Sequence, residues 1–233
     1  MDSYFTFGTL ALGTVLVAKH FFGRRQSIQN PPSLKGRSNL GVVVTGGSRG
    51  VGFALARRFL QLGHRVVICG RNPTSLQAAQ EELDAKFPNR VFSIACDITD
   101  YAQLVELGKF ATKSLQCIDV WINNAGISQS KANVSEMKSE EIKRIIDCNL
   151  LGAAYGVKVA VEVMNQQESG GHVFLMEGAG SDGRVMPKHS MYCTSKFGVW
   201  TCTSSMYVCT CLYSRLHFIY VCCNSLYIVH IYM

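Results

Sequence analysis

Between residues 40 and 176, short apolar runs alternate with segments in which apolar residues recur every three or four positions. Uninterrupted runs of Val, Ile and Leu are typical of strands buried on both faces, whereas the longer period indicates helices. The predicted strands span residues 40–45, 65–69, 91–95, 118–122 and 172–176, and the predicted helices span residues 51–62, 74–86, 101–115 and 139–165. This alternation predicts right-handed crossovers and a parallel sheet with helices on both faces, which is a doubly wound α/β fold.

The start of the chain lies outside this pattern. Residues 4–18 carry no charge and basic residues follow directly, so residues 1–25 are interpreted as an N-terminal membrane anchor or, alternatively, as a hydrophobic arm that is buried or lies on a membrane surface. If they span a membrane, the basic residues place the following domain on the cytoplasmic or stromal face. Residues 26–39 contain Pro31-Pro32 and no apolar period, so we interpret them as a linker.

Residues 199–233 form a hydrophobic tail rich in Cys and Tyr. From residue 201 onward the tail contains no Asp, Glu, Gly or Pro and follows neither a helical nor an alternating period. Such a composition is prone to aggregation. Two interpretations are a second membrane segment over residues 218–233 and an unrelated extension in place of the usual C-terminal part of the domain. Residues 40–198 remain as the single predicted domain.

Composition and charge narrow the class of protein. Charged residues make up 17% and hydrophobic residues 48% of the 233 residues, which excludes a disordered chain, a collagen and a coiled coil. The net charge is +7, but residues 41–198 hold 17 basic and 15 acidic residues, so no basic stripe indicates nucleic-acid binding. The ten Cys residues are scattered and lack zinc-site spacing, so we expect free thiols and no metal site.

A glycine-rich turn joins the first predicted strand to the first helix. Residues 45–52 read Thr-Gly-Gly-Ser-Arg-Gly-Val-Gly, the pattern TGxxxGxG. Glycines at such a turn let backbone amides approach a pyrophosphate and let the helix N-terminus face the phosphate charge. Between a strand and a helix, the pattern predicts a dinucleotide site. The cofactor-binding residues predicted here are Thr45, Gly46, Ser48, Arg49, Gly50, Val51 and Gly52.

The end of the second strand bears on which dinucleotide binds. A carboxylate there grips a ribose 2′-hydroxyl, whereas a basic residue accepts a 2′-phosphate. The strand ends Cys69-Gly70-Arg71 without a carboxylate, and Arg49 projects from the glycine turn. Two guanidinium groups around one phosphate favour NADP(H) over NAD(H). The alternative is that both arginines are solvated surface charges.

Two further motifs make the pattern specific. Asn123-Asn124-Ala125-Gly126 follows the fourth predicted strand, and Tyr192-x-x-x-Lys196 follows the fifth. With TGxxxGxG in the same order, residues 40–198 resemble the short-chain dehydrogenase/reductase family. The resemblance implies a Rossmann fold and NAD(P)-dependent oxidation of an alcohol or reduction of a carbonyl substrate, by a homo- or hetero-oligomer.

The resemblance also implies roles for matching residues. Those implied to contact the cofactor are Asp97, Ile98, Asn123, Ala125 and Gly126. For Asp97 the expected contact is the adenine, and the alternative is that it caps the following turn. Asn149 matches the helix asparagine of the family's proton relay, and Asn is otherwise slightly unfavourable inside a helix.

Tyr192 and Lys196 are the predicted catalytic pair. Their spacing of four places both side chains on one helix face. A phenol has an ordinary pKa of about 10, too high to shuttle protons readily at neutral pH, and a neighbouring ammonium stabilises the phenolate. We therefore predict that Tyr192 is the acid/base and that Lys196 tunes it and contacts the ribose. The alternative is a packed Tyr and a surface Lys.

One position departs from the family. The family usually places a serine 13 residues before the catalytic tyrosine, where this chain has Ala179. Ser181 lies two residues later. We expect Ser181 to hold the substrate oxygen, with the loop rearranged to bring it there.

Three segments sharpen the resemblance. They are residues 121–126 (Trp-Ile-Asn-Asn-Ala-Gly), 170–174 (Gly-Gly-His-Val-Phe) and 178–183 (Gly-Ala-Gly-Ser-Asp-Gly), which are similar to the chlorophyll b reductase branch of the family. This similarity implies NADPH-dependent reduction of the 7-formyl group of chlorophyll b to a hydroxymethyl group, at the stromal face of a chloroplast thylakoid or envelope membrane. The alternative is a membrane-associated carbonyl, lipid or steroid reductase on the cytoplasmic face of the endoplasmic reticulum.

The end of the family's fold is harder to find in this chain. The family continues after the lysine with a sixth strand, a Pro-Gly turn at the nicotinamide and a seventh strand, but here the last proline is Pro187 and the last glycine is Gly198. We therefore expect a single domain that lacks the usual last strands. Because such a loss leaves an apolar sheet edge, the alternative function is a truncated, inactive isoform that binds only cofactor or partner subunits.

Overall fold

The computed structural model describes residues 38–209, 216–222 and 225–230. The expected anchor in residues 1–25 and nearly all of the expected linker lie outside these ranges. Within them, no helix combines the length and the apolar character that crossing a membrane requires.

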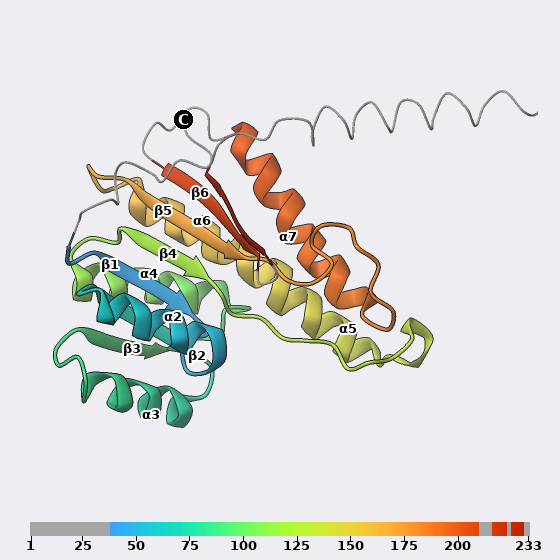
Figure 1. The fold of residues 1–233 in the computed structure, drawn as a ribbon, viewed down its shortest axis with the longest axis horizontal. Coiled ribbons are helices and arrows are strands. Elements are labelled where there is room, and N and C mark those ends of the chain that lie inside the picture. Colours follow the sequence, from blue (N-terminus) through green and yellow to red (C-terminus); the bar gives the residue numbers. More distant parts are fainter. Residues whose placement is uncertain (1–37, 210–215, 223–224, 231–233) are drawn as a thin grey trace, which may run out of the picture.

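Seven strands form one sheet in the order β3-β2-β1-β4-β5-β6-β7 (Figure 1). Each of β1 to β6 runs parallel to its neighbours in that group, and β7 is antiparallel to β6. Strand β1 lies inside the sheet, with β2 and then β3 on one side of it and β4 on the other side. The strand order therefore reverses direction between β1 and β4. In sheets of this kind, ligands bind at the carboxyl ends of the two strands beside this switch point. The strands are β1 (Gly41–Thr45), β2 (Arg65–Gly70), β3 (Val91–Ala95), β4 (Val120–Asn123), β5 (Gly171–Met176), β6 (Leu216–Cys222) and β7 (Ser225–His230).

Helices cover both faces of the sheet. Successive residues of a strand point to opposite faces, so one strand packs against helices on both sides. Val42 and Val44 of β1 pack in one apolar cluster with α2 and α3, whereas Val43 packs in the other cluster with α4, α6 and α7. The helices are α2 (Gly50–Gln61), α3 (Pro73–Asp84), α4 (Tyr101–Leu115), α5 (Ser139–Ile146), α6 (Gly152–Met164) and α7 (Ser190–Cys209). The predicted doubly wound α/β fold is confirmed.

The long helix predicted over residues 139–165 is interrupted. Helix α5 passes into a π-helical turn at Asp147–Leu151, and α6 follows from Gly152. A π turn holds more residues than an α turn and is frequent at functional sites. Asn149 lies in the middle of this turn and is 1% exposed, so the irregular turn carries one of the predicted catalytic residues.

The sheet does not end at β5, which corrects the expectation that the last strands are missing. Helix α7 runs past residue 198, β6 pairs in parallel with β5, and β7 pairs with β6. The β-branched and aromatic content of these strands suits a sheet even without an alternating period. Two residues separate β6 from β7, and so short a connection joins antiparallel strands. Strand β6 therefore covers the edge of β5.

Candidate active site

The glycine turn between β1 and α2 brings backbone close to backbone. Gly46 and Gly50 have φ angles of 65° and 57°, in the left-handed region that favours glycine. A Cβ on Gly52 would lie 2.3 Å from the carbonyl oxygen of Gly46, so glycine alone lets α2 start this close to the turn. The first turn of α2 has no side-chain cap, which leaves its N–H groups able to bind an anion.

A cavity of about 650 Å³ opens at this turn, at the carboxyl ends of β1, β2 and β4. Ten predicted cofactor residues line it, namely Gly46, Ser48, Arg49, Gly50, Val51, Gly52, Arg71, Ile98, Ala125 and Gly126. A larger cavity of about 950 Å³ between α4 and α6 contains none of the predicted site residues.

The charges of the smaller cavity fit a phosphorylated ligand. Arg49 and Arg71 both line it and are exposed, and its lining of described residues includes no Asp or Glu. Burial raises the pKa of the Cys148 thiol in its wall, so this group is neutral. The glycine cradle, the start of α2 and the two guanidinium groups together match the phosphates of a dinucleotide.

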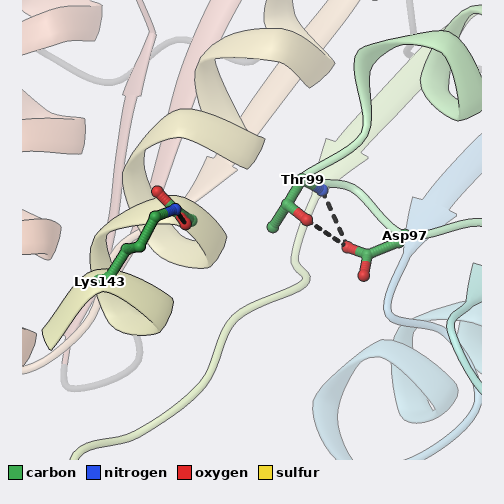
Figure 2. Close-up of polar contacts among 4 residues, drawn as sticks. Asp97, Thr99 and Lys143 are labelled. Carbon is green, nitrogen blue, oxygen red and sulfur yellow. Dashed lines mark hydrogen bonds and ion pairs between the residues drawn. The ribbon is translucent and has the colours of Figure 1, made fainter. Parts of the chain in front are cut away.

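Five predicted cofactor residues do not line the cavity, namely Thr45, Asp97 and Asn123, and Tyr192 and Lys196, which are described below. Thr45 Oγ1 accepts the N–H groups of Asn124 and Ala125, each at 3.0 Å, and so ties the loop after β4 to the end of β1. Asp97 Oδ1 accepts from Thr99 N and Oγ1 at 3.0 and 2.9 Å, which is the turn-capping role (Figure 2). Asn123 is buried on β4, where its Oδ1 accepts from Trp121 Nε1 at 3.1 Å. Thr45 and Asp97 therefore shape the loops around the site.

Figure 2 also shows Lys143, which lies on α5 and apart from Asp97 in this view. Lys143 lines a side cavity of about 200 Å³ together with Arg71 and Thr99. Its ammonium group is paired with Asp147 one turn further along. The positive charge of Lys143 is therefore largely matched within its own helix.

Asn149 joins the loop after β4 to helix α7. Its Nδ2 donates to the carbonyl oxygen of Ile127 at 2.9 Å and to Ser195 Oγ at 3.0 Å, and its Oδ1 accepts the N–H of Ile127 at 2.8 Å. Ser195 Oγ in turn donates to the carbonyl oxygen of Tyr192 at 2.7 Å. The buried amide thereby fixes the cavity loop relative to the helix that carries Tyr192.

Tyr192 and Lys196 lie together over the end of β5. Lys196 is 6% exposed, and its Nζ donates to the carbonyl oxygen of Met176 at 2.9 Å. A Cβ on Gly178 would lie 2.3 Å from Tyr192 Oη and 3.2 Å from Lys196 Cγ, so both side chains pass over the backbone of Gly178. A Cβ on Gly126 would lie 3.6 Å from Lys196 Nζ. Because Gly126 lines the cavity, the Tyr–Lys pair lies at the Gly126 end of it.

The predicted Ser181 has a partner that the sequence did not reveal. Ser181 is 1% exposed, and its Oγ donates to Glu177 Oε2 at 3.1 Å. Burial raises the pKa of the Glu177 carboxyl, and the hydrogen bond from Ser181 opposes that shift. The loop after β5 therefore brings a half-buried carboxyl group and a hydroxyl group next to the glycine that contacts Tyr192.

Gln129 is a second residue that sequence reasoning missed. It is 5% exposed, and its Oε1 accepts the N–H groups of Met191 and Tyr192 at 3.0 and 3.1 Å. Its Nε2 donates to the carbonyl oxygen of Lys188 at 2.9 Å. Gln129 thus caps the first turn of α7 from a loop about sixty residues away, a pairing for which the sequence carries no signal.

The fold and the site together define a class of protein. A doubly wound sheet with a glycine cradle at its switch point, and a buried Lys beside a Tyr at the end of the cavity, are the parts of a dinucleotide-dependent oxidoreductase. Residues 41–222 match the family described as short chain dehydrogenase. The chain therefore belongs to the short-chain dehydrogenase family, and the match extends through β6.

Several relatives in this family are chlorophyll(ide) b reductases. The chain is 33% identical over 199 residues to chlorophyll(ide) b reductase NOL, chloroplastic, of Arabidopsis thaliana, a match that covers 85% of this chain and 55% of the relative. It is 36% identical over 174 residues to probable chlorophyll(ide) b reductase NYC1, chloroplastic, of the same plant, covering 68% of this chain and 35% of the relative. The chain thus spans roughly a third to a half of the length of these relatives.

Solved structures agree with the fold. A metagenomic short-chain oxidoreductase in complex with NADP is 27% identical, with a TM-score of 0.72 over 81% of this chain and 85% of that chain. A short chain dehydrogenase/reductase from Burkholderia phymatum in complex with NAD has a TM-score of 0.74 over 79% of this chain and 65% of that chain at 22% identity, a likeness of fold alone.

Proposed function

We propose that this chain is an NADPH-dependent carbonyl reductase that converts the formyl group of chlorophyll b or chlorophyllide b to a hydroxymethyl group. The observation that carries the proposal is the placement of Tyr192 and buried Lys196 at the Gly126 end of the cavity. The names of the NOL and NYC1 relatives support the choice of substrate. The exposed arginines of the cavity support NADPH over NADH, since no carboxylate lines it among the described residues.

Each part of the site has a role in this proposal. The backbone of residues 46–52 holds the pyrophosphate, and Arg49 and Arg71 hold the 2′-phosphate. When bound, NADPH supplies a hydride to the formyl carbon. Tyr192 Oη donates its proton to the formyl oxygen, which becomes the hydroxyl group of the product, and the Lys196 ammonium stabilises the phenolate that remains.

Two further residues assist the proton transfer. Asn149 holds the loop and α7 in register and is the residue through which the family's proton relay passes in this proposal. Ser181 supplies a hydroxyl group that holds the formyl oxygen, in place of the family serine for which this chain has Ala179. Asp97 and Ile98 form the adenine end of the site, with Asp97 shaping the turn.

The proposal includes a location and an assembly. The chloroplastic relatives support a chloroplast location, where a pigment substrate is available in the membrane. The proposed assembly is a homo- or hetero-oligomer, as the resemblance to the family implies.

The test uses the full chain with NADPH and chlorophyllide b. Energy transfer from Trp121 and Trp200 to the nicotinamide measures binding, and loss of NADPH fluorescence after pigment is added measures turnover. We expect saturable binding and pigment-dependent oxidation of NADPH. In Tyr192→Phe we expect binding to persist and turnover to fall by about 100-fold or more, because phenylalanine has no proton to donate. Binding without turnover by the unaltered chain, or equal turnover by Tyr192→Phe, contradicts the proposal.

A further inference from the structure

Glu177 is a titratable residue in the catalytic region, and the mechanism above gives it no role. It is the first residue after β5, half-buried, and its Oε2 lies 3.1 Å from Ser181 Oγ. The charged groups that act on its carboxyl are Lys196 from α7 and Asp182 from its own loop. The next residue, Gly178, is the one over which Tyr192 Oη lies. The carboxyl, the hydroxyl and the phenol are thus gathered around one turn of backbone.

The chemistry of this pair depends on one proton. A serine hydroxyl carries a single proton to donate, and an ionised carboxylate can only accept. When Glu177 is ionised, the Ser181 proton is held by Glu177, and Ser181 Oγ has only lone pairs to offer a substrate. When Glu177 is protonated, it can donate to Ser181 Oγ and leave the Ser181 proton free to point at a carbonyl oxygen.

We propose that Glu177 is a positioning residue whose protonation state sets the direction of the Ser181 hydrogen bond to the substrate oxygen. This inference rests on the proposed carbonyl reduction and on the role given there to Ser181. The protonated form of Glu177 suits a carbonyl, which needs a donor. The ionised form suits an alcohol, whose own hydroxyl can donate to the lone pairs of Ser181.

The environment of Glu177 brings this switch toward the neutral range. Partial burial raises the pKa of the carboxyl, and the negative charge of Asp182 raises it further, whereas the Ser181 hydrogen bond and the Lys196 ammonium lower it. Burial is the largest of these effects. Because the acid form is the active one for reduction, reduction is full below the pKa of Glu177 and declines as the pH rises through it.

The test measures NADPH-dependent reduction of chlorophyllide b by the full chain across pH. We expect kcat/KM of the unaltered chain to fall by about tenfold per pH unit above the pKa of Glu177. Glu177→Gln keeps an N–H donor toward Ser181 Oγ at every pH, so this decline disappears. Ser181→Ala lowers kcat and also abolishes the decline. A merely structural Glu177 would change the rate without changing the pH profile.

Asp182→Asn is the matched control on the same loop. Asp182 is exposed and paired with Arg184, outside the proposed machinery. Removing its charge lowers the pKa of Glu177, so the decline moves to lower pH and remains present.

An infrared difference spectrum between the unaltered chain and Glu177→Gln provides a readout that needs no activity. It should contain the stretch of a protonated carboxyl group that disappears with rising pH and shifts in Ser181→Ala. A pH decline that persists in Glu177→Gln while Ser181→Ala still lowers kcat overturns the inference and leaves the proposed function intact. If the unaltered chain reduces no chlorophyllide b, the proposed function fails, and the absence of a titrating carboxyl band then overturns the inference as well.

Discussion

At the scale of single residues, the site depends on buried polar side chains that hydrogen-bond to the backbone around it. Lys196, Asn149 and Gln129 are each at most 6% exposed and each holds a backbone carbonyl or N–H group of the site. An unpaired buried polar group costs about 1–3 kcal/mol, so these partners hold the surrounding backbone in one arrangement. The Tyr192–Lys196 pair was predictable because its motif lies within one helix turn. Gln129 was not, because its partners are about sixty residues away.

Arg71 provides a prediction about cofactor choice. Removing the guanidinium group in Arg71→Ser should weaken NADPH binding by about 10- to 100-fold, because a hydrogen bond to a charged group contributes about 1.5–3 kcal/mol. NADH lacks the 2′-phosphate, so its affinity should change little. Fluorescence titration with each nucleotide measures both. Arg57→Ser, on an exposed part of α2 outside the cavity, is the control, and an equal loss for NADPH and NADH would refute the role of Arg71.

Gln129 provides a prediction about positioning. Gln129→Leu leaves the N–H groups of Met191 and Tyr192 without their acceptor, so the free energy of unfolding should drop by about 1–3 kcal/mol. The kcat for chlorophyllide b should fall as well, because the turn that carries Tyr192 loses its cap. Urea unfolding and steady-state kinetics measure the two effects.

The control for Gln129 is Gln80→Leu. Gln80 lies on α3 and accepts a hydrogen bond from Ser93 on β3, outside the catalytic region, and the substitution removes this hydrogen bond. We expect this variant to lose stability with kcat unchanged. If both variants lower kcat equally, Gln129 has no special positioning role.

At the scale of elements, strands and helices between residues 40 and 176 match the predicted ranges to within about two residues. Short runs of Val and Ile such as those of β1 and β2, alternating with longer helical segments, are typical of a parallel sheet. The π turn at Asp147–Leu151 was not predictable, because one irregular turn barely changes the apolar period of a long helix. This turn carries Asn149. The apolar period therefore predicted the helical region but not the irregular turn that positions Asn149.

The junction of β1 and α2 provides a prediction about an element. Gly52→Ala puts a Cβ 2.3 Å from the Gly46 carbonyl oxygen, and a backbone atom cannot yield as a side chain can. We expect a loss of about 1–3 kcal/mol in the free energy of unfolding and weaker NADPH binding, since α2 must move away from the turn. Thermal unfolding and fluorescence titration measure these. Ala54→Val adds bulk on an exposed position of the same helix and should leave NADPH binding unchanged, so equal effects of the two would contradict this account.

At the scale of the whole molecule, the main difference between expectation and structure lies after α7. The uncharged, aperiodic residues 216–230 gave no signal that distinguishes a strand from a tail, yet β6 continues the sheet in parallel with β5 and β7 closes it as a hairpin. Short apolar segments without a clear period fit more than one kind of structure, so the pattern alone did not identify these strands. The family match through residue 222 agrees with this continuation.

The contribution of β6 can be tested by ending the chain at residue 209. This deletion removes the backbone partner of β5 over Gly171–Met176 and exposes its edge. We expect Tm to fall by about 5 °C or more and aggregation to increase, because an unpaired edge strand pairs with other chains. Calorimetry and light scattering measure these. An unchanged Tm with no aggregation would mean that β6 and β7 add nothing to the fold.

The proposed reduction of the formyl group is tested by following a labelled hydride. The full chain is incubated with chlorophyllide b and NADPH that carries deuterium at both positions of the reactive nicotinamide carbon, and the pigment is analysed by mass spectrometry. We expect a hydroxymethyl product with a single deuterium on the former formyl carbon, formed more slowly by about 100-fold or more in Tyr192→Phe. If the chain is folded and binds NADPH but yields no hydroxymethyl pigment, or yields it without deuterium, the proposed hydride transfer from NADPH to the formyl carbon is wrong.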